Sequence, residues 1–274
     1  MRRPDSWAIV ILRKRFEVPM IKHAPFELPR PASKSLRLHG TIARDLGIAI
    51  TCGRYKPGDL LDGEVASSVK FSVSRTAYRE AVRILSAKGL VESRPKIGTK
   101  VSPHNQWNML DPDVLAWTFE GEPDLALLNC LFELRDIVES SAAALAATRR
   151  TPHQLDAMTD AIDRMARHTL ATEAGRQGDM DFHAWLLQAS GNPFMISLTT
   201  GVQAAVTTTN MFKQRERPFI QDAVDDHRRV LEAIANHDAK RAKEEMGALI
   251  QLALRDIAAA MKAAAKAGTA KPSR

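Results

Sequence analysis

The chain has 274 residues, a length that suits two domains better than one. Hydrophobic residues make up 45% and aromatic residues only 5%, which favours helices over sheets in a globular protein. No apolar run reaches the roughly 18 residues of a membrane span, and Cys52 and Cys130 fit no metal or redox spacing. The composition therefore excludes a membrane-spanning protein and a disulfide scaffold, and we expect a cytoplasmic protein with reduced thiols.

Positive charge is concentrated in the first part of the chain, within a formal net charge of +7. Residues 34–102 hold 13 Lys or Arg and 6 Asp or Glu, whereas residues 103–274 hold 19 and 23. A basic head on a slightly acidic body indicates that the head binds a polyanion such as DNA. Residues 1–33 contain five prolines and no sustained hydrophobic period, so a disordered leader is predicted there.

The basic segment is predicted to fold as three helices and a hairpin. The helices are expected over 36–51, 64–69 and 74–88, and the strands over 90–92 and 99–101. Ser74 is suited to cap the third helix, and Gly89 to end it. This order is typical of a winged helix-turn-helix, whose third helix enters the major groove of DNA.

Beyond residue 110 the sequence shows helical periods and no β-type alternation. Helices are expected near 111–119, 123–148, 152–168, 178–190, 193–213, 219–236 and 239–265, separated by glycine and proline joints such as 175–178. The predicted fold class is therefore mostly α. It comprises a winged helix-turn-helix (34–102), a linker with a short helix (103–122), an all-helical effector-binding bundle (123–265) and a fraying tail (266–274).

The third predicted helix carries arginines at every fourth position, so they line one of its sides. Arginine pairs with guanine through two hydrogen bonds or holds a phosphate, and polar residues at a helix start suit phosphate. The predicted DNA-binding residues are Ser74, Arg75, Thr76, Arg79 and Arg83 on this helix and Arg94, Lys96 and Lys100 on the wing. The alternative is a solvated amphipathic face, but helix, turn, wing and local charge all favour DNA binding.

A second group of polar residues is predicted inside the helical body. Asp179 and His183 lie four residues apart on one helix, among apolar residues that turn their face inward. His227 shares an inward face with Leu231 and Ile234. A carboxylate and two imidazoles that converge in a bundle suit a divalent metal such as zinc. The alternative is that they are hydrogen-bonded core residues without a metal.

Arg135 and Glu139 are also predicted to face the core, in register with Leu128 and Phe132. A buried arginine requires an anionic partner, and a guanidinium matches a carboxylate through two hydrogen bonds. Asn210 follows a run of three threonines that could meet ligand hydroxyls. We therefore assign Arg135, Glu139 and Asn210 as candidate ligand contacts. The alternative for the first two is a surface ion pair that contributes at most ~0.5 kcal/mol.

The segments PGD at 57–59, Glu64 and VSRTAYREAVRILSAKGLVESRPKIGTKV at 73–101 resemble the GntR family of bacterial transcription regulators. The all-helical continuation is similar to the FadR subfamily with its FCD-type domain. The resemblance extends over about 36–260. One departure is Val65, since many members have a DNA-contacting arginine after the glutamate, and this predicts a different operator sequence.

The resemblance implies a homodimeric repressor of a sugar-acid operon, such as a galactonate operon, that its metabolite releases from a DNA operator. Arg135 would hold the effector carboxylate. FadR-type domains commonly bind a metal through one Asp and three His, which places the ligands at Asp179, His183 and His227. The last position falls on Leu249, so water or ligand oxygens would complete the site.

Other classes of function are less well supported by the sequence. A metal-dependent helical enzyme would use the Asp–His group with an open position, but no nucleophile motif or phosphate-binding loop is found. An enzyme would also give no reason for a basic winged head. A metal-sensing regulator without an organic effector stays open. A nucleoid protein without a ligand would not need the inward polar residues.

Overall fold

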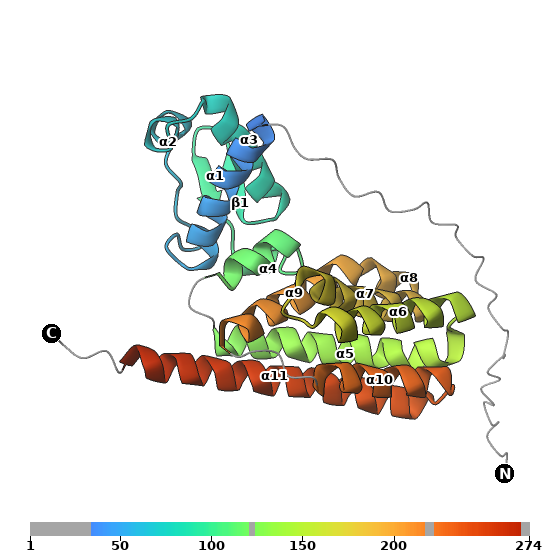
Figure 1. Ribbon diagram of the computed structural model, residues 1–274. Helices are drawn as coiled ribbons and strands as arrows, with labels where there is room; N and C mark the ends of the chain where they lie inside the picture. The colour runs from blue at the N-terminus through green and yellow to red at the C-terminus, as the bar shows by residue number, and fades with distance from the viewer. Residues whose placement is uncertain (1–33, 121–123, 217–221, 270–274) are drawn as a thin grey trace, which may run out of the picture.

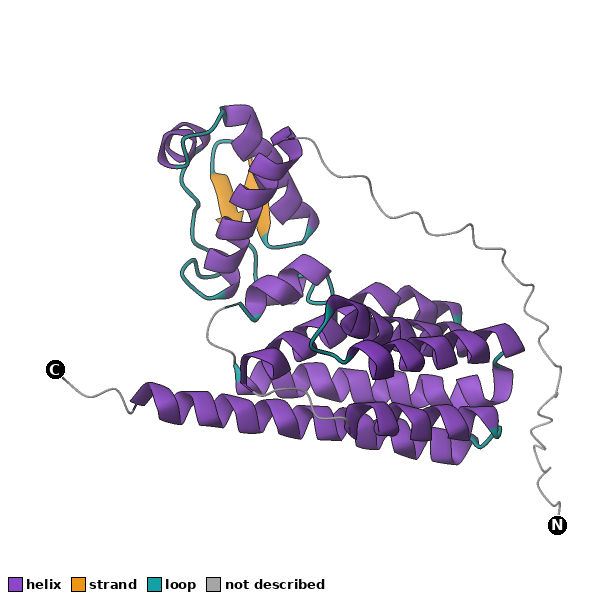
Figure 2. Cartoon of the chain, viewed as in Figure 1, coloured by secondary structure: helices purple, strands orange, loops and turns teal. Residues whose placement is uncertain are grey.

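The computed structural model describes residues 34–120, 124–216 and 222–269, so the predicted leader lies outside the described residues (Figure 1). Helices make up most of this part of the chain, and its one sheet has two strands (Figure 2). The mostly α fold class is confirmed. No helix among the described residues is long and apolar enough to cross a membrane.

The head is a winged helix-turn-helix, as predicted. It comprises α1 (Lys34–Thr51), α2 (Glu64–Lys70), α3 (Arg75–Ala87), β1 (Val91–Arg94) and β2 (Gly98–Val101). The strands are antiparallel, with Val91 opposite Val101 at the base of the hairpin. The Ser74 hydroxyl accepts the backbone N–H of Ala77 at 3.1 Å and so caps α3. Buried side chains of α1, α3 and the strands form the core of the head.

The body is a bundle of long helices below the head in Figure 1. After the short turn η1 (His104–Gln106), its helices are α4 (Pro112–Thr118), α5 (Leu125–Arg149), α6 (Pro152–His168), α7 (Glu173–Ala189), α8 (Pro193–Ser197), α9 (Thr199–Glu216), α10 (Asp222–Ala235) and α11 (Ala239–Thr269). The most extensive helix–helix packing joins α11 to α5 and α6 to α7. One large apolar core runs through the bundle.

Several predicted helix bounds were wrong, and packing explains one of them. Gly175 and Gly178 were expected in a joint but lie inside α7. A Cβ at Gly175 would collide with the Thr169 carbonyl, and one at Gly178 would lie 2.7 Å from the Ala161 carbonyl oxygen. These glycines let α7 approach its neighbours closely. The segment expected as one helix over 193–213 is divided into α8 and α9, and α11 continues to Thr269.

Helix α4 and the residue that follows it contribute to both cores. Val114 and Trp117 pack in the core of the head, whereas Leu115 and Phe119 pack in that of the body. The Trp117 ring lies so close to α1 that a Cβ at Gly47 would collide with it. The segment between the head and the bundle is therefore a packed element in contact with both.

Candidate functional site

The arginines of α3 are exposed, as predicted, but they differ in their partners. Arg79 forms two hydrogen bonds with Glu64 of α2, and Arg83 forms one with Glu80 of its own helix at 2.7 Å. Arg75 and Thr76 are exposed near the start of the helix. A basic, solvent-exposed helix side of this kind can approach a DNA groove.

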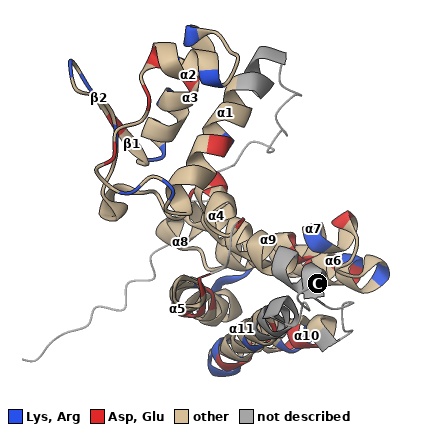
Figure 3. Cartoon of the chain, turned by 90° about the vertical axis from the view of Figure 1, so that its left-hand side faces the viewer, with Lys and Arg blue, Asp and Glu red and all other residues tan. Residues whose placement is uncertain are grey.

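The wing carries the remaining predicted DNA-binding residues. Arg94 is exposed and pairs with Glu92 at 3.1 Å, and Lys96 occupies the turn with a positive φ of 66°. Lys100 on β2 is half-buried. In Figure 3, basic positions are found at the tip of this hairpin and at the upper end of the head. The structure therefore places all eight predicted DNA-binding residues on α3, its N-cap or the wing.

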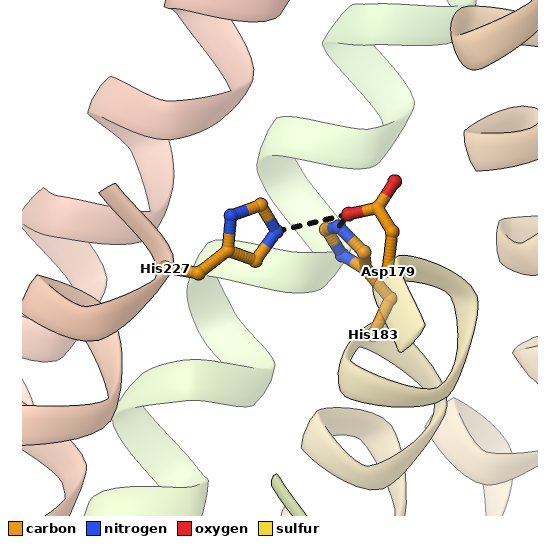
Figure 4. A group of neighbouring side chains, drawn as sticks. All are labelled: Asp179, His183 and His227. Carbon is orange, nitrogen blue, oxygen red and sulfur yellow. Dashed lines mark ion pairs between the residues drawn. The ribbon is translucent and has the colours of Figure 1, made fainter. Parts of the chain in front are cut away.

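Asp179, His183 and His227 converge in the body, as predicted (Figure 4). Helix α7 supplies Asp179 and His183, and α10 supplies His227. Asp179 Oδ1 lies 3.0 Å from His227 Nε2 and 3.6 Å from His183 Nε2. All three side chains are buried, and their potential ligand atoms lie within 4.8 Å of one another.

Both histidines direct their Nε2 atoms toward the same carboxylate. His227 Nδ1 lies 2.6 Å from the Ala223 carbonyl oxygen, which can only accept, so Nδ1 carries a proton. His227 Nε2 is buried and makes no aligned hydrogen bond within the described structure, although Asp179 Oδ1 is close to it. In a neutral imidazole with its proton on Nδ1, the Nε2 lone pair would lie beside the carboxylate oxygen, and this pair of atoms is a donor set that fits a cation.

Glu139 joins this group to Arg135. One of its carboxylate oxygens accepts a hydrogen bond from Arg135 Nε at 2.7 Å, and the other contacts His183 Nδ1. Burial alone would raise the pKa of Glu139, but the neighbouring Arg135 and His183 outweigh it and lower the pKa to about 2. Glu139 therefore orients the imidazole of a potential metal ligand, a role typical of the residues around a metal site.

Charges inside the body balance one another. Burial would lower the pKa of His183, but Glu139 and Asp179 raise it to about 9. Burial would raise the pKa of Asp179, but the neighbouring His183 and His227 hold it well below its usual range. The positive charges of Arg135 and His183 thus offset the negative charges of Glu139 and Asp179.

Helix α9 adds two more polar contacts to the same cluster. Arg135 Nη1 donates to Thr209 Oγ1 at 3.2 Å, and Asn210 Nδ2 donates to Asp179 Oδ2 at 2.7 Å. The candidate ligand contacts Arg135, Glu139 and Asn210 therefore lie in one network with the Asp–His group. The contact between Glu139 and His183 joins residues 44 apart in sequence, and no local pattern predicts it.

This architecture, a winged helix-turn-helix on a helical bundle, is that of a DNA-binding transcription regulator. Residues 38–101 match the bacterial regulatory proteins of the gntR family, and residues 130–252 match the FCD domain. The galactonate operon transcriptional repressor of Escherichia coli (strain K12) is 33% identical to the chain over 203 residues, which cover 73% of this chain and 87% of that protein. The chain belongs to the GntR family and carries the FCD domain.

Other relatives agree with this assignment, and a solved structure shares the fold. The transcriptional regulator LutR of Bacillus subtilis (strain 168) is 31% identical over 71% of this chain and 89% of its own length. The Uxu operon transcriptional regulator of Escherichia coli (strain K12) is 28% identical over 76% of this chain and 80% of its own length. A structure of Lar, which controls the Listeria monocytogenes agr system, shares the fold at a TM-score of 0.58 and 15% identity, covering 84% of this chain and 99% of that one. The chain is a transcriptional regulator and not an enzyme.

Proposed function

We propose that this regulator represses a sugar-acid catabolic operon in the cytoplasm and that the metabolite releases it from its operator. The observation that carries this proposal is the buried Arg135 inside the charge-balanced polar cluster of the body. The name of the galactonate operon transcriptional repressor supports a sugar acid as the ligand class.

The cluster offers complementary groups for a hydroxy acid. Arg135 uses Nε and Nη1 within the protein, and Nη2 makes no hydrogen bond among the described residues. A guanidinium edge of this kind pairs with a carboxylate. Asn210 and Thr209 lie in the same network and can meet hydroxyl groups after small side-chain shifts. Burial strengthens each of these contacts, because little water competes for them.

We further propose that Asp179, His183 and His227 hold a divalent cation such as zinc. The buried His227 Nε2 supports this, because it makes no aligned hydrogen bond although Asp179 Oδ1 is close, and a metal would relieve its desolvation cost. Leu249, at the position where FadR-type members have a further histidine, is buried and offers no ligand atom. When bound, the cation would supply positive charge that attracts carboxylate and hydroxyl oxygens of the effector.

The signal is proposed to reach DNA through α9 and α4. Helix α9 carries Thr209 and Asn210 near the cluster, and nearer its start Gly201 packs against Leu110. Helix α4 contacts both α9 and α1. At the end of α3, Lys88 pairs with Asp111 and Asp113 at the start of α4. A coupling free energy of about 1–3 kcal/mol along this route would change operator affinity roughly 5–150-fold.

Replacing Arg75 or Arg79 by alanine is expected to weaken operator binding by about 1–3 kcal/mol, with the loss concentrated at particular base pairs. Lys100→Ala should instead weaken binding to all sequences alike and reduce the salt slope by about 1, because a phosphate contact carries no sequence information. Gel-shift titrations at several salt concentrations measure both effects. Unchanged operator affinity in both arginine variants would exclude α3 as the recognition helix.

The regulator is also proposed to be a homodimer, because one winged head reads a half-site and a symmetric operator requires two. The outer side of α5 supports this, since Leu134 and Ile137 are 38% and 62% exposed there. Light scattering should give about twice the chain mass of 30.3 kDa. We expect Ile137→Glu to weaken the dimer, whereas Asp160→Ala on the exposed side of α6 should not. A strictly monomeric protein, even with operator DNA, would contradict this prediction.

A further inference from the structure

Glu64, the first residue of α2, forms two hydrogen bonds with Arg79 of α3, the proposed recognition helix. Glu64 Oε1 accepts from Arg79 Nε at 3.1 Å, and Glu64 Oε2 accepts from Arg79 Nη2 at 3.0 Å. Both side chains are exposed, at 44% and 58%. Exposed pairs of this kind stabilise a folded protein only slightly, so the pairing calls for an explanation other than stability.

This contact is specific to Arg79 among the arginines of α3. Arg83 makes a single contact with Glu80 one turn earlier in the same helix. The Arg79 guanidinium is instead fixed by two parallel bonds from a different helix. Two such bonds determine the plane of the group, because they prevent rotation about its terminal bonds.

The bonds to Glu64 leave one edge of Arg79 available. A guanidinium has five N–H donors, and Glu64 uses the Nε donor and one Nη2 donor. The edge formed by Nη1 and the outer Nη2 hydrogen remains, and this edge can donate to O6 and N7 of guanine together. The Glu64 carboxylate next to it repels phosphate, which favours a base over the DNA backbone as the partner.

We propose that Glu64 is a positioning residue for base reading, which fixes the plane of Arg79 and thereby sets the base preference at one operator position. This inference rests on the proposed role of α3 as the recognition helix. Glu64 lowers the general attraction of the head for DNA, since it is negative, and raises discrimination between sequences. The sequence gives no local sign of this pairing, because the two residues are 15 apart and meet only through the turn between α2 and α3.

The test compares base preference with general DNA affinity. An operator is first selected from randomised duplexes with the unmodified protein, and each base pair is then varied. Glu64→Ala is expected to lose about fivefold or more of the discrimination at the base pair that Arg79→Ala also affects. Its affinity for random DNA should stay equal or rise. Glu64→Gln should be intermediate, because it keeps one acceptor and loses the charge.

Glu80→Ala is the matched control, because it also removes one negative charge from the head and frees another arginine of α3, Arg83, from its hydrogen bond. It should raise affinity for random DNA and keep the preference at the Arg79 base pair. An unchanged base preference in Glu64→Ala would overturn the inference. A uniform loss of discrimination at all base pairs, together with a lower melting temperature, would also overturn it. If Arg79→Ala itself alters no base preference, the recognition-helix assignment fails instead.

Discussion

Replacing Arg135 by lysine is expected to preserve operator binding and to remove most of the response to a sugar acid. Lysine keeps the positive charge beside Glu139, but its ammonium group lacks the planar fork that binds Glu139 and Thr209 and that we propose to bind the ligand carboxylate as well. We expect about a tenfold or greater increase in the ligand concentration that releases operator, since one charge-assisted contact to the ligand is lost. Lysine is preferred to alanine, because breaking a buried ion pair costs about 3–5 kcal/mol and alanine could unfold the body.

The measurement is a gel-shift titration with galactonate and related hexonates, accompanied by the melting temperature with and without ligand. Arg164→Lys is the control, because Arg164 pairs with Asp160 and Asp181 outside the cluster. It should respond as the unmodified protein does. If Arg135→Lys releases operator at the normal ligand concentration, the carboxylate binds elsewhere. If a metal alone releases operator and no sugar acid has an effect, the regulator is a metal sensor.

Local periodicity was sufficient to predict which residues of the site face inward. Asp179 and His183 are one helical turn apart, and Arg135 and Glu139 share a stripe with Phe132, so each pair could be assigned to a buried face. The structure places all four in the core of the body. Periodicity gives a direction relative to one helix axis, and this direction does not depend on where the neighbouring helices lie.

Contacts between helices could not be predicted in the same way. Glu139 was assigned to the ligand from its spacing to Arg135, but its second oxygen contacts His183 of α7. Gly175 and Gly178 were taken as a joint, since a sequence cannot distinguish a glycine that ends a helix from one that permits close packing. Both depend on how α5, α6 and α7 pack, which involves residues far apart in sequence.

His227→Leu is expected to remove the stabilisation that zinc gives to the protein. In the presence of a chelator, the variant should melt below the unmodified protein, because leucine removes the Nδ1 hydrogen bond to Ala223 and a neighbour of the buried Asp179 carboxylate, so each protein is compared with its own metal-free form. With zinc at about 100 times its dissociation constant, the unmodified protein should gain about 2.7 kcal/mol. This corresponds to a rise of roughly 5–11 °C for a protein of this size. The variant should gain nothing.

Thermal melting with zinc or chelator and elemental analysis measure these effects, with about one ion per chain expected in the unmodified protein. His153→Leu is the matched control, because His153 is exposed on α6 and lies outside the Asp179, His183 and His227 group. It should bind zinc and gain stability as the unmodified protein does. Zinc that stays bound in His227→Leu would place the metal elsewhere. If zinc leaves the melting temperature of the unmodified protein unchanged, the polar cluster binds its ligand through Arg135 and its hydrogen-bonding neighbours alone.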